Sequence, residues 1–371
     1  MVLGICAGAA GACTPAERPR DHLIVGLEGT PTQVDPRFSL DAYSSRVGTL
    51  LYAGLLRTTP DGATEPALAE TMEVPSPTHY RLRLREGLRF HDGSPLEAAD
   101  VAATLESIQD PAVGSPKAAS FALLSHIETI DARTLDLYLT EPHAPFPVAL
   151  TVGIVPRAWR HRAAGTEPPP GAGPYRLARW DRGRALRLER FEGYYEGRPT
   201  LGAVEFQVVP DPTVALLKLK AGELDLLQNM VNPDHLKALA RMPDLQVIEA
   251  EGVNYSYLGF NLEDPVVGNV LVRRALAHAI DRRSIVTHLL RDSATPATGL
   301  LAPSNWAYTP DVRVYPYDPA RARALLDEAG YPKPPGGGPR LRINYKTSTN
   351  PQRRQIAEIF QQQLADGTAV A

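Results

Sequence analysis

The stretch YRLRLREGLRFHDGSPLEAADV, residues 80–101, holds the clearest structural pattern in the chain. In its first half, apolar and basic side chains alternate, with Tyr80, Leu82 and Leu84 on one side and arginines on the other. Successive side chains of a strand point to opposite faces, so this alternation predicts a strand with one buried and one solvent-facing side.

The second half of the stretch predicts a turn followed by a helix. Asp92 precedes a glycine and suits an Asx-type turn rather than a metal bond. Ser94 is followed by Pro95 and then, three residues after the serine, by Glu97, which is the pattern of an N-cap with a capping box. We therefore expect a helix over residues 95–109.

The composition indicates a globular chain of more than one packed unit. At 371 residues the chain is longer than one core usually organises, and its 43% hydrophobic content is typical of folded proteins. The 29 glycines and 35 prolines predict many turns between short elements. The 39 basic and 42 acidic side chains are mixed along the chain and give a net charge of -3, so the basic stripe that a nucleic-acid binder needs is absent.

Both cysteines, Cys6 and Cys13, lie in the apolar N-terminal run MVLGICAGAAGAC. The small residues before Cys13 resemble a bacterial lipobox, where a signal peptidase cuts before a cysteine that becomes diacylated. No Lys or Arg precedes the run, which is short for a full signal sequence. Either the signal starts upstream or the run is an alanine-rich tail that arises by chance. We favour the first alternative and predict a lipid anchor at Cys13.

The opening block also carries a resemblance to a known family. Its segment LREGLRFHDGSPLEAADV, residues 84–101, resembles the signature of the oligopeptide-, dipeptide- and nickel-binding class of extracellular solute-binding proteins, family 5, which serve ABC transporters. GAGPYRL at 171–177, GELD at 222–225 and VRRALAHAIDRRSIV at 272–286 resemble the same class, and the likeness covers nearly all of 23–365. The resemblance implies an α/β fold with two lobes, of the periplasmic-binding-protein type II and its large three-subdomain class.

The same resemblance implies a division of the chain. The expected parts are a partial lipoprotein signal at 1–13, a linker at 14–21, subdomain Ia of the first lobe at 22–44 and 169–253, subdomain Ib at 45–168, and the second lobe at 254–371. The family's sequences continue past the position that matches Ala371, so we expect a truncated second lobe. The proline- and glycine-rich run at 165–174 supports an internal boundary, because neither a helix nor a central strand accommodates it.

Periodicity and capping residues predict the remaining elements. Strands are expected at 22–28, 134–140, 175–179, 185–191, 203–209, 224–227, 255–261 and 341–345. Helices are expected at 43–56, 212–222, 272–280, 282–290, 319–329 and 351–364, with Asp281 and Asp318 as N-caps of two of them.

Ten residues are candidates for contact with a solute held between the lobes. They are Leu40, Asp41, Ala42, Tyr43, Phe121, Asn229, Tyr255, Tyr257, Asn261 and Trp306. The resemblance places residues 40–43 at the cleft, although a plain surface loop is the alternative. Asn229 follows the strand expected at 224–227, and open α/β sheets bind ligands at the carboxyl ends of strands. The aromatic candidates would wall side-chain pockets, yet apart from residues 255–261 each is more typical of a core.

The residues favour binding without catalysis or a cofactor. The nine histidines are scattered and form no pair at metal-ligand spacing, so no direct metal site is predicted. No Gly-x-Ser-x-Gly elbow is present, which leaves a hydrolase with a site assembled only in three dimensions as a minor alternative. The resemblance implies a monomeric, exported protein in the periplasm or on the outer face of the membrane. It would capture peptides or a similar small solute and deliver them to a permease, with a nickel or metal-chelate solute as the alternative.

Overall fold

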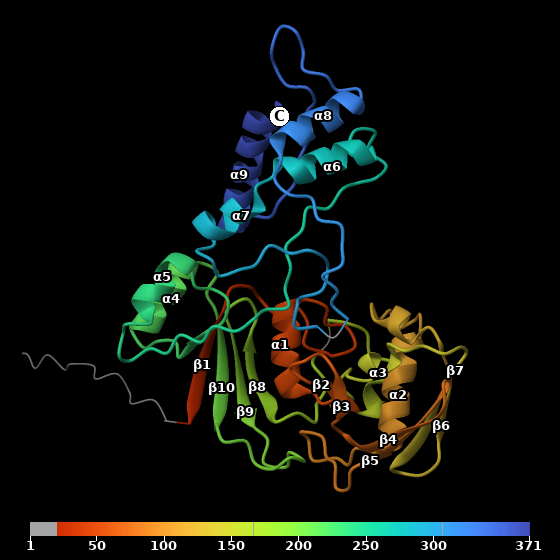
Figure 1. The fold of residues 1–371 in the computed structure, drawn as a ribbon. Coiled ribbons are helices and arrows are strands. Elements are labelled where there is room, and N and C mark those ends of the chain that lie inside the picture. Colours follow the sequence, from red (N-terminus) through yellow and green to blue (C-terminus); the bar gives the residue numbers. More distant parts are fainter. Residues whose placement is uncertain (1–20, 166, 306) are drawn as a thin grey trace, which may run out of the picture. The chain divides into compact units, whose positions relative to one another are not determined.

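The computed structural model describes residues 21–165, 167–305 and 307–371, and it divides into two units at Val231 and Asn232 (Figure 1). Unit 1 contains both β-sheets of more than two strands, and unit 2 is built from helices and extended segments. The α/β class expected from the sequence is confirmed. The subdomain and lobe boundaries expected at 44/45, 168/169 and 253/254 stay a prediction.

Unit 1 alternates short strands with helices. Its strands are β1 (His22–Leu27), β2 (Leu56–Thr58), β3 (Thr64–Pro66), β4 (Ala69–Ser76), β5 (His79–Leu84), β6 (Leu124–Thr129), β7 (Thr134–Leu139), β8 (Tyr175–Asp181), β9 (Ala185–Arg190), β10 (Ala203–Val208) and β11 (Leu226–Leu227). Its helices are α1 (Ala42–Leu51), α2 (Ala98–Gln109), the 3₁₀ turns η1 (Ala118–Phe121) and η2 (Arg157–Trp159), α3 (Phe146–Ala149) and α4 (Pro212–Lys220).

A five-stranded sheet in the order β11-β1-β10-β9-β8 forms one part of unit 1. β1 runs parallel to both β10 and β11, whereas β9 pairs antiparallel with β10 and β8. Because side chains alternate along β1, Val25 and Leu27 pack into the core that contains α1, and Ile24 packs into a smaller core that contains α4. The sheet is therefore covered by a helix on each face.

The second sheet, in the order β4-β5-β7-β6, is antiparallel and packs on α2. The stretch that opened the sequence analysis supplies its second strand and the helix. Tyr80, Leu82 and Leu84 are buried, whereas Arg81 and Arg83 are exposed, so the predicted two-sided strand is confirmed. The apolar side of this strand contributes to the larger of the two main cores of unit 1.

The start of α2 differs from the prediction. The helix begins at Ala98 with Glu97 as its N-cap, and the Asp100 side chain accepts the Glu97 N–H at 3.0 Å. Ser94 instead closes the turn, since its N–H and its hydroxyl both donate to Asp92 Oδ1, at 2.9 and 2.6 Å. Pro95 takes part in a β-bridge with Arg89, which holds it in extended backbone outside the helix.

His91 joins this turn to the GAGP segment. Its backbone N–H donates to Gly171 O at 2.8 Å, and the Gly171 N–H donates to His91 Nδ1 at 3.2 Å. His91 Nε2 lies 3.1 Å from Gly173 O, so the neutral tautomer with its proton on Nε2 satisfies both ring nitrogens. Burial lowers the pKa of His91 to about 4. Side chains at Gly171 or Gly173 would overlap the backbone of Leu51, so this junction requires glycine.

Unit 2 packs three of its helices around one core. Its elements are α5 (Pro233–Leu239), α6 (Val270–Ala279), α7 (Arg282–Ser284), the π-helical turn η3 (Ile285–Leu289), α8 (Pro319–Glu328) and α9 (Pro351–Thr368). Leu276, Leu325 and Leu341 belong to that core. The predicted N-caps are confirmed, because Asp281 accepts the Ser284 N–H at 3.0 Å and Asp318 accepts the Arg321 N–H at 2.9 Å.

Two strands expected in unit 2 are not formed among the described residues. Residues 255–261 have no ladder partner there, and their alternation has no buried side, since Tyr255 and Tyr257 are 43% and 73% exposed. Residues 341–345 are reduced to one parallel bridge between Leu341 and Val370. Alternation alone therefore overestimated strand content, because a strand also requires a partner for its backbone.

Several boundaries in unit 1 also differ from the prediction. The helix expected at 43–56 ends at Leu51, and Leu56 begins β2. The strand expected at 224–227 is shortened to Leu226–Leu227. The sequence patterns missed β4 and β6, because their exposed polar residues leave little of the apolar alternation that marks a strand.

The buried His91 predicts a specific pH dependence of stability. The unfolded histidine takes up a proton near its ordinary pKa of 6.5, whereas the folded one does so only near 4. The folded state therefore binds fewer protons in this window, and the free energy of unfolding should fall between pH 6.5 and 4 by about 3 kcal/mol from this group.

Urea denaturation at pH 7, 5.5 and 4 measures this effect. His91→Gln should lose that part of the pH dependence, whereas the control His161→Gln, at an exposed histidine, should keep it. Identical pH slopes for the wild type and His91→Gln would contradict the assignment.

Candidate ligand-binding site

The carboxyl ends of β1, β10 and β11 lie at one edge of the five-stranded sheet, because these three strands are parallel. Gly26 pairs with Leu227, so the chain leaves β1 and β11 side by side. Asn229 follows β11 and is exposed, with a left-handed φ of 60°. Among the described residues we find no hydrogen-bond partner for its side chain. This edge is where open α/β sheets bind ligands.

The loop after β1 is fastened to the start of α1 by Asp41. The Asp41 carboxylate accepts the Ser44 N–H at 2.8 Å and the hydroxyls of Thr32 and Ser44 at 2.7 and 2.5 Å. Ser44 Oγ in turn accepts the backbone N–H groups of Thr32 and Gln33, at 2.9 and 3.1 Å. Burial opposes the charge on Asp41, but the hydrogen bonds from Ser44 and Thr32 outweigh it and lower the pKa of the carboxyl group.

The neighbours of Asp41 differ in what they present to solvent. Leu40 is 67% exposed, and Ala42, the first residue of α1, is also exposed. Tyr43 is partly buried and packs against the core that contains α1 and β1. Its ring lies directly against Gly29, where a Cβ would overlap it. Residues 40–43 and Asn229 are thus both positioned by the carboxyl edge of the sheet.

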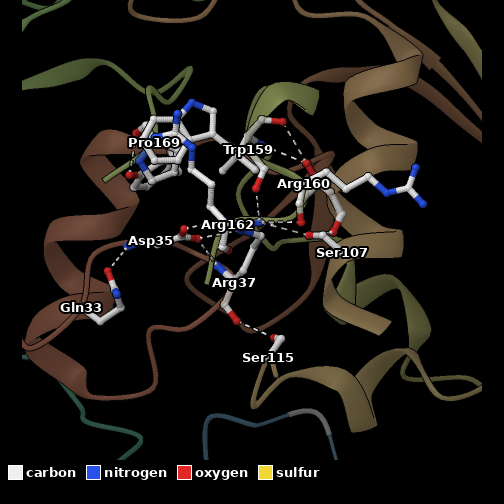
Figure 2. Close-up of polar contacts among 12 residues, drawn as sticks. Gln33, Asp35, Arg37, Ser107, Ser115, Trp159, Arg160, Arg162 and Pro169 are labelled. Atoms are coloured by element: carbon white, nitrogen blue, oxygen red, sulfur yellow. Dashed lines mark hydrogen bonds and ion pairs between the residues drawn. The ribbon is translucent and has the colours of Figure 1, made fainter. Parts of the chain in front are cut away.

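A buried ion pair between Asp35 and Arg37 anchors the same loop, and sequence reasoning missed it. The Arg37 side chain is fully buried, and the two groups form parallel bonds, Nε to Oδ1 at 3.1 Å and Nη2 to Oδ2 at 2.7 Å (Figure 2). Arg37 N–H also donates to Asp35 Oδ1 at 3.0 Å. No local sequence pattern marks this arginine as buried.

The remaining guanidinium donors reach distant segments (Figure 2). Nη1 donates to Trp159 O at 2.9 Å and to Ser107 Oγ at 3.4 Å, and it lies 3.5 Å from Arg160 O. Nη2 lies 3.5 Å from Arg162 O. The Ser115 hydroxyl donates to Arg37 O at 2.6 Å. The pair therefore ties the loop to α2, to residues 159–162 and to the turn before η1.

The other predicted contact residues fall in different environments. Phe121 corrects one expectation, because it is 1% exposed and packs edge-on against Phe146 in the core. Tyr255 and Tyr257 form an exposed pair with ring centroids 5.3 Å apart. The Asn261 side chain accepts the Glu263 N–H at 3.2 Å, which is a local turn contact. Trp306 and Cys13 lie outside the described residues, so the structure places neither of them.

In the part of the chain that the structure describes, no group of three or more His, Cys, Asp or Glu residues is arranged to hold a metal ion. No described helix is both long and apolar enough to cross a membrane.

Solved structures show that the fold is that of the two-lobed α/β periplasmic binding proteins. NikZ from Campylobacter jejuni, solved with Ni(L-His), superposes with a TM-score of 0.85 at 25% identity, over 95% of this chain and 73% of NikZ. The oligopeptide-binding protein AppA from Bacillus subtilis, solved with a nonapeptide, gives a TM-score of 0.84 at 26% identity, over 94% of this chain and 73% of AppA.

Sequence comparison gives the family. The glutathione-binding protein GsiB of Escherichia coli O1:K1 is 30% identical over 373 aligned positions, which cover 98% of this chain and 71% of GsiB. Residues 63–368 match the family described as bacterial extracellular solute-binding proteins, family 5 Middle. The chain belongs to this family. It is therefore the exported, substrate-binding component of an ABC importer, works with a membrane permease and is not an enzyme.

The contact between Gly29 and Tyr43 predicts that substitutions at these two positions have non-additive effects on stability. Gly29→Ala should destabilise the protein by about 1 to 3 kcal/mol, because the added methyl group must displace the Tyr43 ring. In a Tyr43→Ala background the same change should cost much less, and a double-mutant cycle from urea denaturation measures the difference. Equal penalties in both backgrounds would show that the ring does not limit the space at Gly29.

Proposed function

We propose that the solute is a peptide or a peptide-like small molecule that binds at the carboxyl edge of β1 and β11. Two relatives support this ligand class: GsiB is a glutathione-binding protein, and AppA was solved with a nonapeptide. The observation in this chain that carries the proposal is the exposed side chain of Asn229 at that edge. An amide side chain donates and accepts hydrogen bonds, so it is complementary to a peptide group.

Apolar and aromatic side chains complete the proposed contact set. Leu40 exposes most of its surface, and the partly buried Tyr43 ring packs against Gly29. Tyr255 and Tyr257 present an exposed aromatic pair from a segment without a strand partner among the described residues. Exposed aromatic side chains bind apolar ligand groups at low entropic cost, because only two side-chain torsions must be ordered.

A metal chelate is the second candidate, and the Ni(L-His) complex of NikZ favours it. A chelate carries its own donor atoms, so its binding does not require a cluster of protein carboxylates or imidazoles. Such a ligand fits the described residues, in which no group of three metal-binding side chains is assembled.

Isothermal titration calorimetry of the purified chain distinguishes the two candidates. Glutathione and the peptide Ser-Thr-Ser-Ala represent the first class, and Ni²⁺ mixed with L-histidine represents the second. We expect heat of binding with at least one of the peptides and none with the nickel chelate. Binding of the chelate alone would reject the peptide proposal in favour of the second candidate.

The role of Asn229 is tested by two substitutions. Asn229→Gly removes the amide and tolerates the left-handed backbone, whereas Asn229→Ala also strains it. Losing a hydrogen bond to the solute costs about 1 to 3 kcal/mol, so Kd should rise roughly 5- to 150-fold in both variants. Gln228, the exposed residue before Asn229, provides the control: Gln228→Ala should bind the solute with wild-type affinity. Unchanged affinity in Asn229→Gly would remove this residue from the site.

We further propose that Cys13 is a lipid anchor and that the chain acts as a monomer. The run AGAC at 10–13 and the polar tether behind it support the anchor, and light scattering checks the oligomeric state. With a basic leader fused before Met1, expression in a bacterium fed alkyne-palmitate should label the protein. Cys13→Ser should abolish the labelling, and Cys6→Ser should leave it unchanged. Equal labelling of both variants would reject the anchor.

A further inference from the structure

The loop that carries the proposed contacts is held at two places by different partners. At one end, Asp41 and Ser44 bind Thr32 and cap α1, and all of these bonds span at most 12 residues. At the other end, Arg37 reaches Ser107 and the carbonyls of residues 159–162, which lie 70 to 125 residues further along the chain. Leu40 and its neighbours lie between these two anchors.

We propose that the Asp35–Arg37 pair is a positioning device that sets where residues 40–43 lie for solute binding. The inference rests on the proposed function of those residues. Asp41 fixes the position of the loop relative to α1. Arg37 fixes its position relative to two other segments, α2 and residues 159–162. Arg37 is therefore a positioning residue that does not touch the solute, since its side chain is fully buried.

The geometry is suited to this role because the guanidinium is planar and its donors point in fixed directions. Nε and Nη2 bind the two oxygens of Asp35, which orients the plane. That orientation aims Nη1 at Trp159 O, 2.9 Å away. The carbonyl of Arg37 is held separately by Ser115. A shift of the loop would break several directional bonds at once.

A paired substitution separates positioning from stability. Asp35→Leu with Arg37→Met removes both charges of the pair, so neither is left buried without the other and the largest cost of a single substitution is avoided. The bonds to residues 159–162 are nevertheless lost. Arg81→Met with Asp136→Leu is the matched control, because Arg81 binds the two Asp136 oxygens at 2.8 and 2.7 Å on the outer side of β5 and β7.

Hydrogen exchange of the solute-free protein reads out the loop directly. Each exchange rate is first corrected for the variant's global free energy of unfolding. The amides of residues 38–45 should then exchange on the order of tenfold faster in the Asp35/Arg37 variant than in the wild type or the Arg81/Asp136 control. Glutathione titration should show weaker binding only in the first variant.

Exchange of residues 38–45 at the wild-type rate in the paired variant would overturn the proposal. Equal loss of protection in the Arg81/Asp136 control would also overturn it, since that result means general destabilisation. If neither glutathione nor Ser-Thr-Ser-Ala binds the wild type, the proposed ligand class is wrong, while the exchange comparison still decides whether the pair positions the loop.

Discussion

The burial of one charged pair, Asp35 with Arg37, constrains much of unit 1. Removing a guanidinium and a carboxylate from water costs several kcal/mol per ion, and the attraction between them offsets this cost only when the geometry is good and the remaining donors are bonded. Here the two groups form parallel bonds, and the other donors meet a serine hydroxyl and backbone carbonyls. The chain path around this pair is therefore restricted, because each partner must stay where it satisfies the arginine.

Gly171, next to Ala172 of the larger core, lies against Leu51 and Tyr52 of the core that contains α1, and this junction also includes polar bonds. The Tyr52 hydroxyl donates to Pro169 O at 2.9 Å, and burial, together with the charge of Asp35, raises the pKa of Tyr52. Nearby, His91 binds the backbone at Gly171 and Gly173. Directional bonds at such a junction fix the relative orientation of two cores more narrowly than apolar packing does.

This arrangement is compatible with the proposed solute site, which requires no catalytic group. Most polar side chains of the loop after β1 form hydrogen bonds within the protein. Asp41, whose pKa is lowered, accepts hydrogen bonds from Thr32 and Ser44 and so holds the loop to the start of α1. The groups left exposed include an apolar side chain, Leu40, and the amide of Asn229. In the proposed site, such groups would recognise the shape and hydrogen-bonding pattern of a solute without reacting with it.

Sequence alone determined the features that depend on neighbours within a few residues. The alternation in β5, which repeats every two residues, and the caps Asp281 and Asp318, which each bind a backbone N–H three residues ahead, are examples. The tertiary structure decided whatever needs a distant partner: the burial of Arg37 and Phe121, and the absence of a strand at 255–261 among the described residues. Periodicity records which side chains share a face, but it does not record which segment will cover that face or pair with its backbone.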